Sequence, residues 1–360
     1  MASASHARLR ETPSKMLCSR IPHPLVGGIL GSFHCGEDMF QTRITQMLGI
    51  QYPVVGGAMM WVSTPELTAA VSEAGGLGIL ASAMYSTREA FEQALERTRA
   101  LTKRPFAVNL NLFPMRRPVD NRDYLEAALE QGVRVVETSG HAAPHDLCGR
   151  FREAGVTWIH KCVGLRYARK AEGMGADIVT VVGYENGGAT GKLDIGTLVL
   201  VPRVAQALGI PVIGGGGVSD GRGLLAVLVL GAQGVILGTR LLATKEAPLH
   251  DTLKQALLGA SEEDTLLVLR SVGATHRVWA NEAAMQCAHL EDTGAEPEEL
   301  FEAMAGEKAR AMYETGDVGM GVMSLGQGVG GIQDIPSVSE LFRRMMTEAR
   351  ERMDELRGES

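Results

Sequence analysis

Two glycine-ended apolar segments carry the clearest chemical signal in this chain. They are residues 210–221, IPVIGGGGVSDG, and residues 234–240, GVILGTR, with a helix-length segment between them. Glycines allow a backbone to approach a phosphate closely and to direct several N–H groups at it, and the N-terminus of a following helix adds to this. The spacing is typical of the last two strands of a (β/α)8 barrel, where such turns form a phosphate site. The alternative is that these glycines only make tight turns.

Polar side chains at the ends of other predicted strands are candidate ligand contacts, because ligands bind at the carboxyl ends of barrel strands. Lys161 is placed to hold a ligand oxygen or an anionic ring edge, or else is a solvated strand-end lysine. Asn109 is placed to hydrogen-bond a ring edge, or else satisfies neighbouring backbone groups. His160 and His141 are candidate contacts or buried core histidines. With its amides, its lysine and few carboxylates, this set suits a planar, polar-edged ligand that carries a phosphate.

The composition argues against several other classes of protein. Glycine makes up 44 of 360 residues and aromatics only 5%, which favours many short strands and tight turns. A formal charge of −7 argues against nucleic acid or an anionic membrane as partner, and no apolar run reaches the roughly 18 residues that span a bilayer. The five cysteines lack metal or disulfide spacing, which predicts a cytoplasmic protein with reduced thiols and no metal site. No pair of carboxylates indicates glycosidase chemistry, and no G-x-S-x-G elbow is present.

The elements that must position these groups alternate between short apolar strands and helices. Ser63 and Glu66 predict a capping box at the start of the first of these helices. The predicted strands are residues 52–58, 77–81, 106–112, 133–138, 156–162, 178–184, 211–213 and 235–237. Such alternation indicates a parallel sheet with helices on its faces. Eight units favour closure into a TIM barrel of the α/β class over an open doubly wound sheet.

The remaining segments predict the domain organisation. We expect residues 1–38 to be a disordered N-terminal extension, with a transit peptide or an upstream translation ahead of a start at Met39 as alternatives. Residues 244–310 are charged and helical in pattern with no clear strand, which predicts a small helical inserted domain. Residues 39–243 and 311–360 then make the barrel, whose last outer helix begins near Ser337.

Over residues 39–357 the chain resembles the nitronate monooxygenase (formerly 2-nitropropane dioxygenase) family. This is an FMN-dependent TIM-barrel family related to flavin-dependent enoyl-acyl-carrier-protein reductases and NADH:quinone reductases. Beside the two glycine segments, the motifs that carry the resemblance are PVVGGAMM at 53–60, STPEL at 63–67, AGGLG at 74–78, FAVNL at 106–110, HK at 160–161, AE at 171–172, GAD at 175–177, GYENGG at 183–188, KE at 245–246 and GQ at 326–327.

The resemblance implies an FMN site with specific contacts. Met59 and Met60 would lie beside the isoalloxazine, Asn109 and Lys161 would meet its polar edge, and Gln327 would approach from the late glycine loop. A cationic lysine at that edge would favour the anionic reduced flavin. The ribityl phosphate would be held by Gly187, Gly188, Gly215, Gly216, Gly217, Gly238 and Thr239.

One position departs from the family pattern. The family commonly has a substrate-facing histidine directly after the glycine pair at 187–188, and this chain has Ala189. Alanine cannot transfer a proton, so a mechanism that needs a base there requires a substitute. Thr190, His160, His141 or a water are the candidates, and the sequence does not choose among them.

The resemblance implies an oxidoreductase of the nitronate monooxygenase type, which oxidises a small anionic nitronate-like substrate with O2 or another electron acceptor. Such a substrate is already anionic and needs less acid–base help than a neutral nitroalkane. The alternative is an NAD(P)H-dependent flavin reductase of an enoyl thioester or quinone, with NAD(P)H as co-substrate. A flavin-binding module without activity and a barrel for another phosphorylated metabolite are further alternatives. A homodimer is one candidate assembly, with no nucleic-acid or membrane partner.

Overall fold

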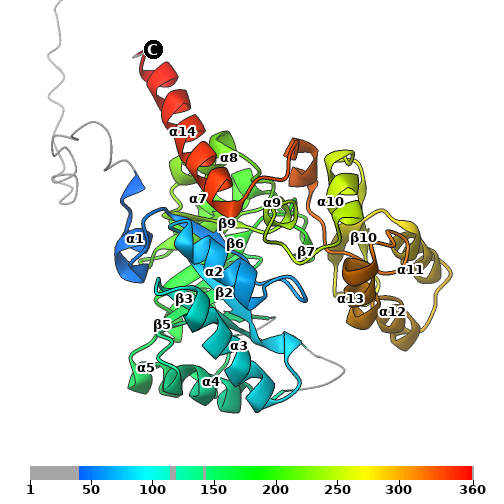
Figure 1. Cartoon of the computed structure of the whole chain (residues 1–360), viewed down its shortest axis with the longest axis horizontal. Helices are drawn as coiled ribbons and strands as arrows, with labels where there is room; N and C mark the ends of the chain where they lie inside the picture. Colours follow the sequence, from blue (N-terminus) through cyan, green and yellow to red (C-terminus); the bar gives the residue numbers. More distant parts are fainter. Residues whose placement is uncertain (1–39, 114–118, 141–142, 359–360) are drawn as a thin grey trace, which may run out of the picture. The chain divides into compact units, whose positions relative to one another are not determined.

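The computed structural model describes residues 40–113, 119–140 and 143–358. Within these residues, eight parallel strands alternate with helices and form one sheet (Figure 1). Their order is β1–β9–β8–β6–β5–β4–β3–β2. The strands are β1 (Val54–Gly56), β2 (Gly78–Ala81), β3 (Phe106–Asn111), β4 (Val135–Ser139), β5 (Thr157–Cys162), β6 (Ile178–Val182), β8 (Val212–Gly215) and β9 (Gly234–Leu237). Each predicted strand is present in its predicted place.

The two edges of this sheet meet, which confirms the predicted barrel. Val55 pairs in parallel with Leu77, just before β2. The Gly56 backbone N donates to the Leu77 carbonyl at 2.9 Å, and the Leu77 backbone N donates to the Val54 carbonyl at 2.9 Å. The barrel interior is filled by inward-facing aliphatic side chains from successive strands, as expected for this fold.

The outer helices follow the strands in the predicted alternation. They are α2 (Pro65–Glu73), α3 (Arg88–Leu101), α4 (Asn121–Glu130), α5 (Cys148–Ala154), α6 (Leu165–Gly173), α7 (Thr197–Ala205) and α8 (Gly221–Val229), with α1 (Arg43–Leu48) before β1. The last helix, α14 (Val338–Arg357), packs against α8 and α2 and is N-capped by Ser337 as predicted (Figure 1). In the part of the chain that the structure describes, no helix is both long and apolar enough to span a bilayer.

The predicted capping box at α2 is wrong by one residue. Thr64, directly before Pro65, is the N-cap, because a residue before proline is driven into the extended region, and its φ of −74° and ψ of 169° suit a cap. Ser63 serves the preceding loop instead. Its hydroxyl accepts from the Met59 backbone N at 2.9 Å and donates to the Gly57 carbonyl at 3.1 Å.

The segment predicted to be helical without strands contains two strands. β10 (Thr265–Val268) and β11 (His276–Trp279) form an antiparallel hairpin, and β11 also pairs with β7 (Gly188–Ala189). Segments of four residues are too short to separate strand from helix by periodicity, and β11 begins with a histidine and an arginine. The other elements of this segment are α10 (Asp251–Leu258), α11 (Glu282–Asp292), α12 (Pro297–Ala303) and the start of α13 (Gly306–Thr315); α9 (Thr239–Leu242) precedes it and η3 (Gln327–Gly331) follows it.

The division into a barrel and an inserted unit at residues 244–310 stays a proposal. An apolar cluster that includes Leu269, Val278, Cys287 and Leu300 supports it, because this cluster is separate from the one inside the barrel. The predicted disordered extension, residues 1–38, lies outside the described residues.

Candidate active site

Inward-facing side chains change from apolar to polar toward the carboxyl ends of the strands. Ile159 on β5 belongs to the barrel core, and Lys161 faces the same way because strand side chains alternate. Lys161 lies between Ser139 on β4 and Thr180 on β6 in the strand register. The inward polar positions on four adjacent strands are Asn109, Glu137, Lys161 and Thr180.

Asn109 lies at the centre of a buried hydrogen-bond network in this mouth. Its Nδ2 donates to Glu137 Oε2 at 2.6 Å and to Ser139 Oγ at 3.1 Å. Glu137 Oε1 and Thr180 Oγ1 are buried and have no hydrogen-bond partner among the described residues. Buried polar atoms without a partner are rare in native proteins, so this donor and acceptor set fits a ligand that brings its own polar edge. The sequence predicted few carboxylates at this rim and missed Glu137.

The turn after β8 forms a bare backbone cradle. Gly216 and Gly217 have φ values of +105° and +75°, conformations that L side chains rarely adopt. A Cβ on Gly216 would lie 2.7 Å from Thr197 Oγ1 and 2.9 Å from the Gly183 backbone N. The cradle therefore excludes a side chain and exposes backbone groups, as a phosphate site requires.

The late glycine loop completes this end of the site. Gly326 donates its backbone N–H to Thr239 Oγ1 at 2.9 Å, and the Gln327 backbone N donates to the Glu185 carbonyl at 2.9 Å. A Cβ on Gly187 would lie 2.8 Å from the Gly326 backbone N. The structure thus brings Gly187, Thr239 and Gln327 to one place, as the sequence predicted.

A buried arginine fixes the short helix α9 that begins at Thr239. Arg240 is only 2% exposed, and its Nη2 lies 2.8 Å from Asp334 Oδ1. Arg344 of α14 binds the other oxygen of Asp334 at 2.6 Å and holds the pKa of that carboxyl below its usual range. These contacts tie α9, which begins at Thr239, to the last barrel helix, α14.

The loop after β1 contributes the two predicted methionines. Met59 lies beside Gly238, since a Cβ there would be 3.8 Å from the Met59 Sδ. Met60 is 43% exposed, at the outer side of this loop. Trp61 follows with a left-handed φ of 63°, and Arg310 of α13 lies 5.0 Å from the centre of its ring. The loop is therefore fastened both to the barrel and to the C-terminal helices.

His160 lies on the opposite face of β5 from Lys161. Its Nδ1 is 2.9 Å from Thr138 Oγ1, which also accepts from Trp158 Nε1 at 2.8 Å. The histidine is 1% exposed, and burial lowers its pKa to about 4. It is therefore a neutral core residue at pH 7, and this geometry does not favour the predicted acid–base role.

The depressed pKa of His160 predicts an acid-sensitive stability. In the unfolded chain His160 binds a proton below its ordinary pKa of about 6.5, whereas the folded state resists that proton until about pH 4. With respect to this group, the folded state is therefore most stable above about pH 6.5, and this stability is lost as the pH falls toward 4. We expect a loss of about 3 kcal/mol in unfolding free energy over this window. Denaturant titrations should show a shallower pH dependence for His160→Gln, whereas His289→Gln, at an exposed position, serves as control. An unchanged pH dependence in His160→Gln would contradict this assignment.

The other side chains that could replace the family histidine are His141 and Thr190. His141 lies outside the described residues. Thr190 is buried, and its backbone N donates to the Thr275 carbonyl at 3.2 Å. A Cβ on Gly191 would lie 2.8 Å from a Val163 side-chain atom, which places this segment over the end of β5.

A histidine that the sequence did not single out lies opposite Ala189. His276 of β11 is the cross-strand partner of Ala189, so the two side chains share one face of the small sheet. The His276 Nδ1 lies 3.2 Å from the Ala274 carbonyl, and because a carbonyl only accepts, Nδ1 is a protonated nitrogen. No local motif marks this residue, and only the pairing of β7 with β11 places it opposite Ala189.

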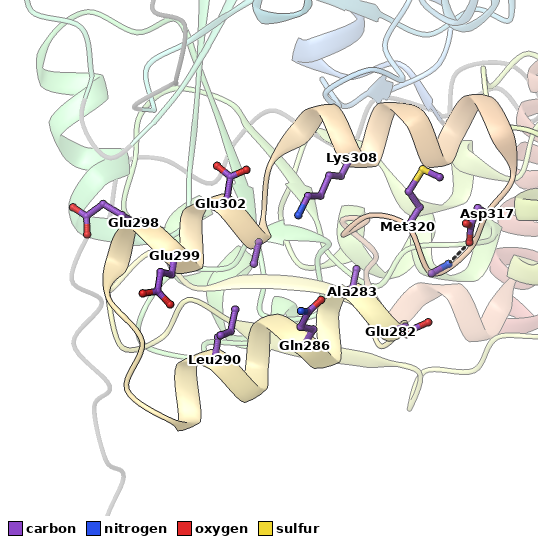
Figure 2. Close-up of a pocket in the computed structure, with 12 residues that line it drawn as sticks. Glu282, Ala283, Gln286, Leu290, Glu298, Glu299, Glu302, Lys308, Asp317 and Met320 are labelled. Atoms are coloured by element: carbon purple, nitrogen blue, oxygen red, sulfur yellow. Dashed lines mark hydrogen bonds between the residues drawn. The ribbon is translucent and has the colours of Figure 1, made fainter.

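The C-terminal helices also form a separate surface groove of about 610 Å³ (Figure 2). None of the predicted site residues lines it. Its lining includes Glu298, Glu299, Glu302 and Asp317, with Lys308 as a cationic member. Such an acidic lining would repel a phosphate or an anionic substrate. In the described residues no group of His, Cys, Asp and Glu could hold a metal ion.

Comparison with known proteins places this geometry in a family context. A sequence model of the nitronate monooxygenase family matches residues 41–348. The (3aS,4S,5R,7aS)-5-hydroxy-7a-methyl-1-oxo-octahydro-1H-indene-4-carboxyl-CoA dehydrogenase of Rhodococcus jostii is 32% identical over 352 residues, which cover 88% of this chain and 98% of that protein. A Staphylococcus saprophyticus protein named "Probable nitronate monooxygenase" is 31% identical over 67% of this chain and 79% of its own length. The structure of FabK from Thermotoga maritima superposes with a TM-score of 0.82 at 34% identity, covering 88% of this chain and 99% of FabK.

Proposed function

Because the chain belongs to the nitronate monooxygenase family and is a flavin oxidoreductase, we propose that it uses FMN to oxidise a small anionic nitronate-like substrate with O2. The observation that carries this proposal is the barrel mouth, because Lys161, the Asn109 network and the glycine cradle all lie toward the carboxyl ends of strands of one barrel. A cation at this edge attracts an anionic substrate and stabilises negative charge that develops there. When bound, FMN supplies the electron acceptor for the oxidation.

The residues of the chain divide into binding and orienting roles. The cradle at Gly216–Gly217 would hold the phosphate through backbone N–H groups, and the Gly326 backbone N–H fixes Thr239 beside it. Asn109 and Lys161 hold the polar edge of the ring, and Met59 packs beside it. His276, across from Ala189, supplies the polar side chain that orients the substrate.

A second candidate is an NAD(P)H-dependent reductase of an enoyl thioester or quinone. The similarity to a carboxyl-CoA dehydrogenase favours this candidate, because that relative's name includes a CoA thioester and the similarity covers 98% of its length. The similarity to FabK, which covers 99% of that protein, also favours it. A reductase of this kind must protonate its product, so it needs an acid that Ala189 cannot provide. This need makes it the weaker candidate. A homodimer and a cytoplasmic location remain predictions.

Oxygen uptake separates the two functions. Protein reconstituted with FMN is supplied with propionate 3-nitronate or propyl-2-nitronate, and free FMN at the same concentration is the control. We expect uptake well above that control without a nicotinamide. Anaerobic bleaching of the bound flavin by NADH or NADPH, together with no uptake on either nitronate, would favour the reductase instead.

A further inference from the structure

A buried carboxylate lies beneath the polar mouth of the barrel, and the proposed reaction does not use it. Glu137 on β4 is fully buried, at 0% exposure. Its Oε2 accepts one short hydrogen bond from Asn109, and its Oε1 has no partner among the described residues. Burying a carboxylate with incomplete pairing is costly, so stability alone does not explain a glutamate here.

This carboxylate determines which way the Asn109 amide faces. A carboxylate only accepts hydrogen bonds, so Asn109 must turn its Nδ2 toward Glu137. The second hydrogen of Nδ2 goes to Ser139 Oγ at 3.1 Å. With both hydrogens used, Asn109 can present only its carbonyl Oδ1 to a ligand. The imide N–H of a flavin ring is a donor, whereas the two flanking ring carbonyls are acceptors, so Oδ1 matches the imide.

The charge of Glu137 also lies close to that of Lys161. Glu137 pairs with Ile159 in the register of β4 and β5, and Lys161 is two residues further along the same face. Neighbouring strands are about 4.8 Å apart and two residues rise about 6.6 Å along a parallel strand, so the two backbones are roughly 8 Å apart, within reach of long side chains. The ion pairs found in the described residues nevertheless do not include these two groups. The ring edge held at Asn109 therefore lies under the influence of both an anion and a cation.

We propose that Glu137 is a positioning residue for the flavin: it holds Asn109 as an acceptor for the ring imide, and its negative charge opposes the charge gained on reduction. The proposal rests on the proposed FMN site. The positive charge of Lys161 favours the reduced anionic ring and raises the flavin reduction potential. The negative charge of Glu137 opposes this and lowers the potential, so the two residues together set its value.

Three variants test the two parts of this proposal. Glu137→Gln keeps an acceptor for Asn109 and removes the charge, Glu137→Leu removes both, and Ser139→Ala removes only the longer bond from Asn109. The readouts are the dissociation constant of oxidised FMN, from flavin fluorescence, and the reduction potential, from equilibration with a reference dye. Neither readout requires the physiological substrate or turnover.

We expect Glu137→Gln to bind oxidised FMN within about threefold of wild type and to favour reduced over oxidised flavin by at least tenfold, which is about 30 mV for a two-electron couple. Glu137→Leu should weaken oxidised FMN binding by at least about tenfold, because Asn109 loses the acceptor that fixes its amide. Ser139→Ala should leave the potential unchanged. An unchanged potential in Glu137→Gln overturns the electrostatic part, and unchanged affinity in a folded Glu137→Leu overturns the positioning part. If Glu137→Leu does not fold, the potential of Glu137→Gln still decides the electrostatic part, and a loss of FMN affinity of more than about tenfold in Glu137→Gln, which keeps the acceptor for Asn109, would overturn the positioning part. Wild-type protein that binds no FMN would instead refute the proposed function.

Discussion

A Gly216→Ala variant is expected to fold and to bind FMN about 10-fold to 100-fold more weakly than the wild-type protein. The φ of Gly216 is +105°, and a Cβ there would lie 2.7 Å from Thr197 Oγ1 and 2.9 Å from the Gly183 backbone N. An alanine relieves this conflict by moving the turn. Binding of the phosphate must then restore the original backbone, at a cost of roughly 1–3 kcal/mol.

The matched control is Gly132→Ala, measured by the same FMN fluorescence titration. Gly132 has a similar left-handed φ of +77°, is exposed, and has nothing within 4 Å of an added Cβ. It imposes backbone strain away from the site, so we expect a lower melting temperature with unchanged FMN affinity. Equal FMN affinities for Gly216→Ala and wild type would show that the turn after β8 does not hold the phosphate.

His276→Ala is expected to lower kcat on a nitronate about 100-fold, the size of loss that misplacing a bound substrate can cause. His276 and Ala189 are cross-strand partners on one face of the small sheet, and His276 Nδ1 is oriented by the Ala274 carbonyl. Because the proposal assigns His276 to the substrate and not to the phosphate, FMN affinity should be unchanged. Stopped-flow reduction of the FMN-loaded enzyme measures the effect on the oxidation step itself.

The pairing also supplies a rescue test. A histidine at position 189 would project from the same face of the sheet as His276. The double variant Ala189→His/His276→Ala should therefore regain at least about tenfold of the kcat that His276→Ala loses. Ala189→Gln in that background is the control for size. Wild-type turnover in His276→Ala would rule out the proposed role, and a loss with no rescue would point to a structural role for His276.

The barrel could be predicted from sequence because each strand and helix is a local pattern. Every strand of the barrel lies where its apolar run predicted, and the glycine segments mark the carboxyl ends of β8 and β9. The hairpin of β10 and β11 was missed because its strands are only four residues long. Its existence depends on tertiary pairing with β7, which no local pattern contains.

The errors at the site have separate physical causes. His160 and Lys161 are adjacent in sequence and were considered together, yet strand alternation places them on opposite faces. Glu137 was missed although a signal existed, since a charged residue in the predicted strand at 133–138 is expensive to bury and therefore suggests a function. His276 had no such signal, because only the folded sheet places it opposite Ala189.

The most direct test of the central claim is anaerobic mixing of FMN-loaded protein with propionate 3-nitronate while the flavin absorbance is followed. The proposal predicts that the visible absorbance bleaches without any nicotinamide and returns when O2 is admitted. Bound flavin that keeps its absorbance with the nitronate but bleaches with NADPH would contradict nitronate oxidation, and protein that takes up no FMN would contradict the site itself.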